Sequence, residues 1–452
     1  MSNSRPTLNA SPRAVRAAID VLDQWQLRWP TDEYPLDRSV AAFFRAHHEY
    51  NSAERRWISA ALYGTVRLLQ RQKAILNGLG RETSSTDLIN LWKEENDASE
   101  GASELSVEYQ EALANLPGPD SAGEHLRTTL SFPDDLAGEL ERLLGEQAPV
   151  AAAAFNLQAP TTIRVNTLKA NRAKLLRALP ESVPLQYSPW GLELSGRINV
   201  HEVPEFRKGW FEVQEEASQL AALLTDAKPG MTVVDIGAGS GGKTLALGAM
   251  MQNKGSIVAL DHSETRLSEL VLRAKRAGLT EVFLCPVNIE SDGIWHPGTS
   301  AKRTLNRLYN GADCVLVDAP CTGTGTLRRS PDTRWRVRDY DTLTAVQSNL
   351  LQQSAALVKI EGCLIYVTCA FESRQNEEVL EQFLASPIGA NFRIEDGQPA
   401  LTAAVTKAAV FAGKSNWPAA DVAHLFDGPF LRTWPHSSNL DAFFAARLVR
   451  FQ

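Results

Sequence analysis

The sequence has few cysteines and no long apolar run. Five cysteines occur among 452 residues, at positions 285, 314, 321, 363 and 369, and no two of them form a Cys-x-x-Cys pair. A disulfide scaffold and a metal site are therefore not expected. We expect free thiols and a reducing, cytoplasmic setting instead. No stretch approaches the roughly 18 apolar residues of a membrane helix. No apolar segment follows Met1, so neither a signal peptide nor a membrane partner is expected.

An excess of positive charge is also missing, since the formal net charge is −7. Segment 81–146 alone holds 16 acidic and 4 basic residues, so the rest of the chain is net positive. Two runs concentrate this positive charge, RVNTLKANRAKLLR at 164–177 and RRSPDTRWRVR at 328–338. Polyanions respond to such local patches because the field acts over about 10 Å at physiological salt. Solvated helix faces are the alternative interpretation of both runs.

Changes in composition and in the spacing of apolar residues divide the chain into parts. Apolar residues recur at helical spacing within 11–80, which predicts helices. The acidic segment 81–146 is interrupted by Ser, Gly and Pro clusters and is interpreted as a loosely packed connector. A short strand at 161–165 and a basic helix ending near Pro180 then precede strand-like pieces toward Phe211. We expect a small α+β module in this part.

From residue 214 onward, strands alternate with helices, which is typical of an α/β fold with a mainly parallel sheet. The strands are expected at 232–236, 257–260, 282–285, 313–318 and 363–367. Helices are expected to begin near Lys243, Glu264 and Thr342. Residues 392–395 and 443–451 are candidates for a closing antiparallel pair, whereas 398–424 and 291–312 are interpreted as loops.

A glycine-rich turn follows the first of these strands. It comprises Gly237, Ala238, Gly239, Ser240, Gly241, Gly242 and Lys243. Glycines allow a tight turn and close approach to a ligand, while the following helix offers free N–H groups. The turn satisfies Gly-x-Gly-x-x-Gly, a pattern shared by nicotinamide, flavin and S-adenosylmethionine (SAM) enzymes. Because Ala238 stands where a Walker P-loop needs glycine, a Walker P-loop is excluded.

Two polar residues follow the next strands in register with this turn. Asp261 ends the second strand, where a carboxylate can accept hydrogen bonds from ribose hydroxyls. Asn288 lies just beyond the third strand and is a candidate contact for an adenine amine. Helix capping is the alternative role for an aspartate at such a position.

Two cysteines stand just past the ends of two strands. Cys321 follows Asp318-Ala319-Pro320, and Cys369 follows Val367-Thr368. If these strands are neighbours, they lie about 4.8 Å apart and both thiols reach one crevice. The other three cysteines lie inside strands and are interpreted as buried packing residues.

A thiolate, a carboxyl group and a methyl donor together suit one reaction. Carbon 5 of cytosine is too weak a nucleophile to attack a methyl group unaided. A thiolate that adds to carbon 6 turns the ring into an enamine-like nucleophile. A carboxyl at the N3/N4 edge stabilises the charge shift, and a second group can assist release afterwards.

Three segments carry a family resemblance: DIGAGSGGKT (235–244), VDAPCTGTGTLRRSPDTRW (317–335) and VTCAFESRQNEEV (367–379). They resemble the Sun/RsmB family of RNA (cytosine-5)-methyltransferases, and the resemblance covers about 163–450. It implies a Rossmann-like SAM-dependent methyltransferase domain with a seven-stranded, mostly parallel sheet at 214–452. It also implies an α+β RNA-binding module at 146–213 and a NusB-like helical domain at 1–145.

The resemblance also implies roles by position. Cys369 would be the nucleophile, Cys321 the thiol that helps release the product, and Asp318 a contact to the cytosine that lies near the cofactor. The SAM pocket would comprise Gly237 through Lys243, Asp261, Asn288 and Asp318. The two basic runs, rather than the resemblance, supply the candidate RNA contacts, which are Arg164, Lys169, Arg328, Arg329, Arg334 and Arg336.

Substrate and activity are left with alternatives. Small-subunit rRNA is the expected RNA partner, with tRNA as the alternative. Gly237 and Ser240 replace the cysteine and proline usual in the family loop, and Asn288 replaces an aspartate. These departures motivate a second hypothesis, a non-catalytic RNA-binding ribosome-assembly factor. A nicotinamide oxidoreductase is a third hypothesis, but it explains neither thiol. The acidic segment 81–146 is a candidate contact for a protein partner.

Overall fold

The computed structural model describes residues 11–28, 35–99, 101, 103–196, 198–290, 293–411 and 421–452. The chain forms two compact units, one of residues 1–158 with 326–338 and one of residues 159–325 with 339–452. In the described part of the chain, no helix combines the length and apolar character needed to cross a membrane.

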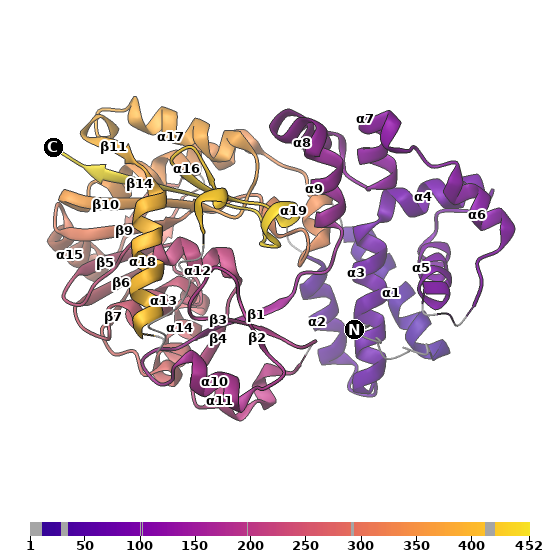
Figure 1. The fold of residues 1–452 in the computed structure, drawn as a ribbon, viewed down its shortest axis with the longest axis horizontal. Helices are drawn as coiled ribbons and strands as arrows, with labels where there is room; N and C mark the ends of the chain where they lie inside the picture. The colour runs from indigo at the N-terminus through magenta and orange to yellow at the C-terminus, as the bar shows by residue number, and fades with distance from the viewer. Residues whose placement is uncertain are drawn as a thin grey trace. The chain divides into compact units, whose positions relative to one another are not determined.

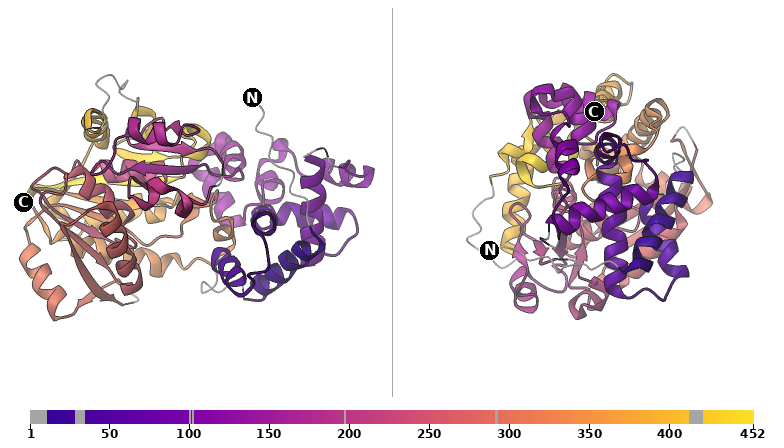
Figure 2. Two further views of the ribbon diagram at one scale, coloured as in Figure 1. Left: turned by 90° about the horizontal axis from the view of Figure 1, so that it is seen from below. Right: turned by 90° about the vertical axis from the view of Figure 1, so that its right-hand side faces the viewer.

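The first unit is built of helices (Figure 2). They are α1 (Pro12–Arg28), α2 (Leu36–Ala46), α3 (Ser52–Arg67), α4 (Leu69–Gly78), α5 (Ser85–Ser99), α6 (Val107–Ala114), α7 (Ala122–Glu124), α8 (Asp134–Leu144) and α9 (Ala148–Phe155). Trp25, Trp57 and Ile58 are buried in the core that α1 and α3 share. The helices predicted within 11–80 are therefore confirmed.

The acidic segment 81–146 is not a loosely packed connector, and that prediction is wrong. It forms α5, α6, α7 and α8, and α5 places Leu88, Ile89 and Leu91 in the same core as Trp57. Some of its charges pair locally, as in the ion pair between Lys93 and Asp97 at 2.5 Å. The high acid content concealed an apolar stripe that is wide enough to pack.

Residues 326–338 belong to the helical unit, although the sequence analysis assigned them to the catalytic domain. The carboxylate of Asp332, in the 3-10 helix η6 (Pro331–Trp335), accepts a hydrogen bond from the backbone N–H of Leu36 at 3.2 Å. This long-range pairing leaves no trace in local sequence. The domain limits at 145 and 213 stay predictions.

The second unit begins with a small antiparallel sheet in the order β2-β3-β1-β4. Its strands are β1 (Thr161–Val165), β2 (Val183–Pro184), β3 (Gly191–Leu194) and β4 (Phe211–Val213). The basic helix α10 (Arg172–Ala178) and the short α11 (Pro204–Arg207) lie between strands. The expected strand at 161–165 and the helix that follows it are confirmed.

A ten-stranded sheet follows, in the order β12-β13-β14-β10-β9-β5-β6-β7-β8 with β11 paired to β14 (Figure 1). Its strands are β5 (Thr232–Ile236), β6 (Ser256–Asp261), β7 (Val282–Ile289), β8 (Trp295–Pro297), β9 (Ala312–Asp318), β10 (Val358–Thr368), β11 (Phe392–Glu395), β12 (Phe426–Asp427), β13 (Phe430–Thr433) and β14 (Phe443–Arg450). The run β10-β9-β5-β6-β7 is parallel, and β11 pairs antiparallel with β14 as predicted. Short edge strands raise the number above the expected seven. The expected α/β fold with a mainly parallel sheet is confirmed.

Helices cover both faces of this sheet. They are α12 (Glu216–Leu223), α13 (Gly242–Met250), α14 (Glu264–Ala277), α15 (Thr299–Leu308), α16 (Tyr340–Ala355), α17 (Glu377–Leu384), α18 (Gly397–Phe411) and α19 (Pro435–Ser438). One core holds side chains of α12, α13 and α18, and another holds side chains of α15, α16 and α17.

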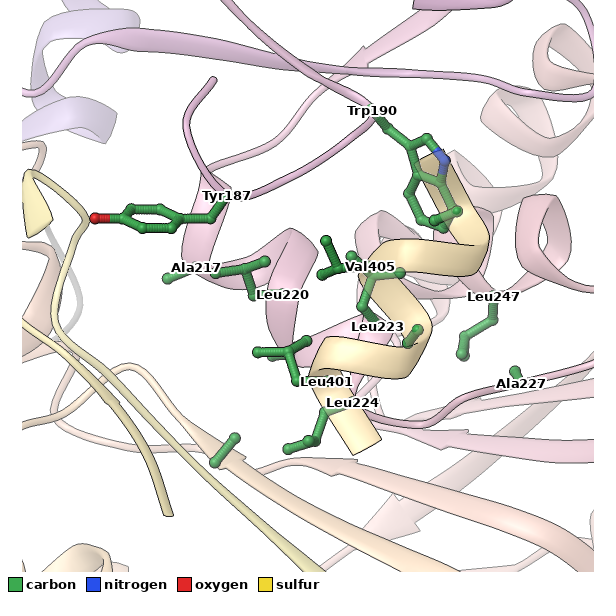
Figure 3. Packing of buried hydrophobic residues seen from close by; sticks show 14 of the residues in the cluster. Tyr187, Trp190, Ala217, Leu220, Leu223, Leu224, Ala227, Leu247, Leu401 and Val405 are labelled. Carbon is green, nitrogen blue, oxygen red and sulfur yellow. The ribbon is translucent and has the colours of Figure 1, made fainter. Parts of the chain in front are cut away.

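Two segments interpreted as loops contain regular structure. Within 398–424, α18 packs Leu401 and Val405 against Leu220 and Leu223 of α12 (Figure 3), and the part at 412–420 lies outside the described residues. The connection at 291–312 contains β8 and α15. Both predictions were wrong because Ala-rich and polar segments form helices once a neighbouring apolar surface covers one face.

Candidate active site

The site lies at the carboxyl ends of two neighbouring strands. β9 and β10 pair in parallel, with Val367 opposite Asp318. The backbone N–H of Ala319 donates to the carbonyl of Val367 at 2.9 Å, so the pairing continues just past the end of β9. Both chains then turn away into loops that carry one thiol each. The predicted adjacency of these strands is confirmed.

The two thiols meet between the loops. The Sγ atoms of Cys321 and Cys369 lie 3.4 Å apart, and both side chains are half-buried. The hydrogen bond with Cys321 raises the pKa of the Cys369 thiol well above its usual value, with burial and the charge of Asp318 adding to the shift. The nearby cation of Lys243 opposes it. The two sulfurs are thus in contact, and the raised pKa favours the thiol of Cys369 over its thiolate.

Lys243 and Asp318 form an ion pair beside these thiols. The Nζ atom of Lys243 donates to Oδ2 of Asp318 at 2.7 Å, with the lysine side chain 10% exposed and the aspartate 34% exposed. Burial alone lowers the pKa of Lys243, but the charge and hydrogen bond of Asp318 outweigh it and the pKa is raised. The lysine therefore stays charged next to the carboxylate. This pair joins the glycine turn to the end of β9.

The glycine turn between β5 and α13 needs glycine for steric reasons. Gly237, Gly239 and Gly241 have φ values of +74°, +53° and +88°, a region that disfavours side chains. A Cβ at Gly237 would also overlap the carbonyl oxygen of Asp318. The turn is thus packed directly against the strand end that carries the catalytic candidates.

Asp261 anchors the same turn from the end of β6. Its Oδ2 accepts the N–H of Gly239 at 2.8 Å, and its Oδ1 accepts the N–H of Ser263 at 2.7 Å. A carboxylate accepts about four hydrogen bonds in all, so lone pairs remain for a ligand. Asn288 differs from its expected place: β7 extends to Ile289, so Asn288 is an exposed residue within the strand and pairs with His296 of β8.

Sequence reasoning missed several residues that hold the two loops. Glu372 is buried, and its carboxylate accepts hydrogen bonds from the hydroxyls of Thr322 at 3.0 Å and Thr324 at 2.5 Å. The side-chain oxygen of Gln375 accepts the N–H of Thr322 at 3.0 Å. Polar residues clustered just after a buried strand were the available signal. These contacts fix the loop that bears Cys321.

Asp235 was also missed. It lies fully buried in β5, and its Oδ2 accepts a hydrogen bond from the hydroxyl of Thr244 at 2.5 Å. Burial raises its pKa to about 7, against the opposing effect of this hydrogen bond. A buried acid in an apolar strand was the signal, and its hydrogen bond joins β5 to the first turn of α13.

The basic residues expected to contact RNA are placed differently from one another. Arg164 is buried and its Nε donates to Gln214 at 2.6 Å, while burial lowers its pKa to about 10. Lys169 is exposed and donates to the carbonyl of Arg276 at 2.6 Å. The expectation of a solvent-facing phosphate contact is therefore not met at Arg164, because its charge is used inside the small sheet.

The Arg-rich run also turns inward. Arg334 is fully buried in the helical unit, and its Nη1 donates to the carbonyls of Arg67 at 2.8 Å and Ser131 at 2.9 Å. Burial lowers its pKa to about 9. Arg328 is buried, whereas Arg329 and Arg336 are half-buried. The prediction that Arg328 and Arg334 contact RNA phosphates is therefore corrected, because both guanidinium groups lie inside the helical unit.

Family models match two parts of the chain. The model for the 16S rRNA methyltransferase RsmB/F family matches residues 222–449, about half of the chain. This range contains the two thiols, Asp318 and the glycine turn. A model for the ferredoxin-like domain of RsmF/B-like methyltransferases matches residues 132–201.

Curated relatives match the same region. A probable ribosomal RNA small subunit methyltransferase B from Synechocystis is 33% identical over 56% of this chain and 56% of its own length. A ribosomal RNA small subunit methyltransferase F from Aeromonas hydrophila is 31% identical over 64% of this chain and 57% of its own length. The similarity thus spans a little over half the length of these relatives.

Solved structures share the fold. The crystal structure of PH0851 superposes on 98% of this chain and 99% of that one with a TM-score of 0.70 and 25% identity. A methyltransferase homolog protein from Pyrococcus horikoshii superposes on 73% of this chain and 99% of that one with a TM-score of 0.56 and 28% identity.

Proposed function

Since the chain belongs to the 16S rRNA methyltransferase RsmB/F family, we propose that it is a SAM-dependent methyltransferase that forms 5-methylcytosine in small-subunit rRNA. One observation carries the proposal: two thiols 3.4 Å apart lie beside a lysine–aspartate ion pair at the ends of adjacent strands. This combination supplies a nucleophile, a second thiol and a carboxylate within one site. These are the groups that cytosine methylation at carbon 5 needs.

The residues present fit SAM as the cofactor. The turn contains glycine at 237, 239, 241 and 242, so its backbone carries few side chains, and Gly237 packs directly against the carbonyl of Asp318. Gly237 through Lys243 would hold the amino acid part, Asp261 the ribose hydroxyls and Asn288 the adenine. SAM supplies an electrophilic methyl group when bound.

The protein's own groups account for the remaining chemistry. In the proposed reaction the Sγ of Cys369 adds to carbon 6 of the cytosine, while Asp318 contacts the N3/N4 edge. Because the pKa of Cys369 is raised, the thiol keeps its proton until the base binds. As the bond from Sγ to carbon 6 forms, this proton passes to N3 of the cytosine, at the edge that Asp318 contacts, and the double bond shifts from carbons 5 and 6 to carbons 4 and 5. Cys321 lies at Sγ–Sγ contact distance and assists loss of the carbon 5 proton and release of Cys369.

The test uses the full-length protein with isotopically labelled SAM and three RNA samples: small-subunit rRNA, intact small subunits and bulk tRNA. We expect label in small-subunit rRNA and a new bisulfite-resistant cytosine there. Label confined to tRNA would overturn the substrate assignment. Undetectable binding of SAM at millimolar concentration, together with RNA binding, would overturn catalysis in favour of an RNA-binding assembly factor.

A further inference from the structure

Arg273 of α14 joins the small sheet to the glycine turn. Its Nη1 donates to the backbone carbonyl of Ser240 at 2.8 Å. The same guanidinium donates from Nε and Nη2 to Oε2 of Glu212 at 3.1 and 3.0 Å. Glu212 lies in β4 and is 2% exposed. One side chain thus contacts both the cofactor turn and the small sheet.

The glycine turn depends on such outside contacts to hold one conformation. Gly239 and Gly241 flank Ser240 and both adopt positive φ, where glycine moves freely among backbone states. Ser240 is held by α14 at two points, since its hydroxyl also donates to Glu269 at 2.5 Å. A turn ordered before the ligand arrives binds it at a smaller entropic cost.

Arg276 provides an internal comparison on the same helix. Its Nη2 donates to both carboxylate oxygens of Glu212, at 2.5 and 2.6 Å, and its guanidinium lies 3.9 Å from the ring centroid of Phe206. Among the contacts of the described residues, Arg276 donates to no atom of the glycine turn. The two arginines therefore share a carboxylate but differ in their link to the cofactor site.

We propose that Arg273 is a positioning residue that sets cofactor affinity by holding the Ser240 carbonyl, and that Glu212 fixes its guanidinium for this purpose. The inference rests on the proposed cofactor, a nucleoside sulfonium compound bound at the glycine turn. The planar guanidinium of Arg273 presents several N–H donors, so it binds the Ser240 carbonyl and the Glu212 carboxylate at once. The single ammonium group of a lysine does not do this. The small sheet and the cofactor site are coupled through this guanidinium.

The test measures binding of S-adenosylhomocysteine to the full-length protein by calorimetry. We expect Arg273→Gln to weaken binding about tenfold, because a charge-assisted hydrogen bond to the turn is lost. Arg273→Lys should fall between this variant and the unchanged protein, and Glu212→Gln should weaken binding in the same direction. Arg276→Gln should bind within about twofold of the unchanged protein, because it leaves the bond to Ser240 in place.

Kinetics separate positioning from general destabilisation. Under the proposal, Arg273→Gln raises the KM for SAM and leaves the KM for RNA unchanged. Equal losses of affinity in Arg273→Gln and Arg276→Gln would overturn it, since disrupted packing around Glu212 would then explain both. Should Arg273→Gln fail to fold, unchanged affinity in the folded Arg273→Lys variant would overturn it. Failure of the unchanged protein to bind the ligand would instead contradict the proposed function.

Discussion

The sulfur atoms of Cys321 and Cys369 lie 3.4 Å apart although 48 residues separate them in the chain. The contact arises because β9 and β10 are paired in parallel with Asp318 opposite Val367, so both loops leave the sheet at the same edge. Cys321 alters the chemistry of Cys369, since the hydrogen bond with Cys321 is the largest cause of the raised pKa of Cys369. The predictions below depend on this pair and its neighbours.

Removal of each thiol should impair a different step of the reaction. We expect Cys369→Ala to abolish methylation, because no nucleophile then reaches carbon 6. Cys321→Ala should form a covalent protein–RNA adduct, because addition proceeds while release is impaired. Denaturing gel electrophoresis with labelled RNA detects the adduct. Full activity of Cys369→Ala, or an adduct in that variant, would contradict the assignment.

Asp318→Asn should change thiol reactivity and methylation in opposite directions. The charge of Asp318 raises the pKa of Cys369, so its removal lowers that pKa and increases the thiolate fraction near neutral pH. Alkylation of Cys369 by iodoacetamide, followed by mass spectrometry from pH 7 to pH 10, should therefore begin at lower pH. Methylation should nevertheless fall, because the carboxylate contact to the base is lost.

Two comparisons make this pH prediction discriminating. Cys321→Ala should also shift alkylation of Cys369 to lower pH, since it removes the first cause of the raised pKa. Cys285 is buried, and burial raises its pKa to about 11, so its alkylation should stay slow in every variant. An unchanged pH profile in both variants would contradict the electrostatic account of the site.

Hydrogen peroxide should join Cys321 and Cys369 in a disulfide. The Cys321 sulfur attacks one peroxide oxygen, the O–O bond breaks, the thiol proton goes to the departing oxygen, and a sulfenic acid and one water result. The Cys369 sulfur then attacks the Cys321 sulfur, the S–S bond forms, the S–O bond breaks, and a second water leaves. Both sulfurs are oxidised and both peroxide oxygens are reduced. Dithiothreitol should restore the thiols and the activity.

Cys314 and Cys363 form a matched control on the same two strands. They are opposite each other in the parallel pairing and interact, but both are buried, 1% and 5% exposed. Non-reducing peptide mapping should find the 321–369 crosslink well before any 314–363 crosslink, because peroxide reaches only the half-buried pair. The reverse order would show that exposure does not govern oxidation here.

Gly237→Ala should lower stability and cofactor affinity together. A left-handed backbone costs a non-glycine residue about 1–2 kcal/mol, and the added Cβ also overlaps the Asp318 carbonyl. Gly428 is the matched control, since its φ is +56° but a Cβ there meets open space. Calorimetric melting should find Gly428→Ala less destabilised, with binding of S-adenosylhomocysteine unchanged. Equal losses in both variants would contradict the steric explanation.

Many strands of the second unit were predictable from the pattern of apolar residues in the sequence. The parallel strands β5, β6 and β9 are short apolar runs bounded by turn residues, and each was expected within one residue of its observed bounds. The end of β7 was misplaced because Pro286 interrupts the apolar pattern, whereas pairing with β8 continues the strand to Ile289. Pairing partners distant in sequence are not visible to a local pattern.

The helical unit shows the opposite outcome. Acid content and Ser, Gly and Pro clusters marked 81–146 as a connector, and a run of arginines after a strand end marked 328–338 as an RNA contact. In the structure, Leu88 lies in the core of the helical unit, and Arg334 is buried and donates to two main-chain carbonyls. Charge is a property of composition, but burial depends on what packs against each side chain.

The sequence by itself determined the chemical groups: two thiols past strand ends, a carboxylate, and a glycine-rich turn. Only the tertiary structure decided which of these groups touch, because the parallel pairing of β9 with β10 brings Cys321 to Cys369. It also decided that Arg273 spans from Glu212 to Ser240. The physical reason is that hydrogen bonds and ion pairs depend on distances of about 3 Å, which residues far apart in sequence reach only through folding.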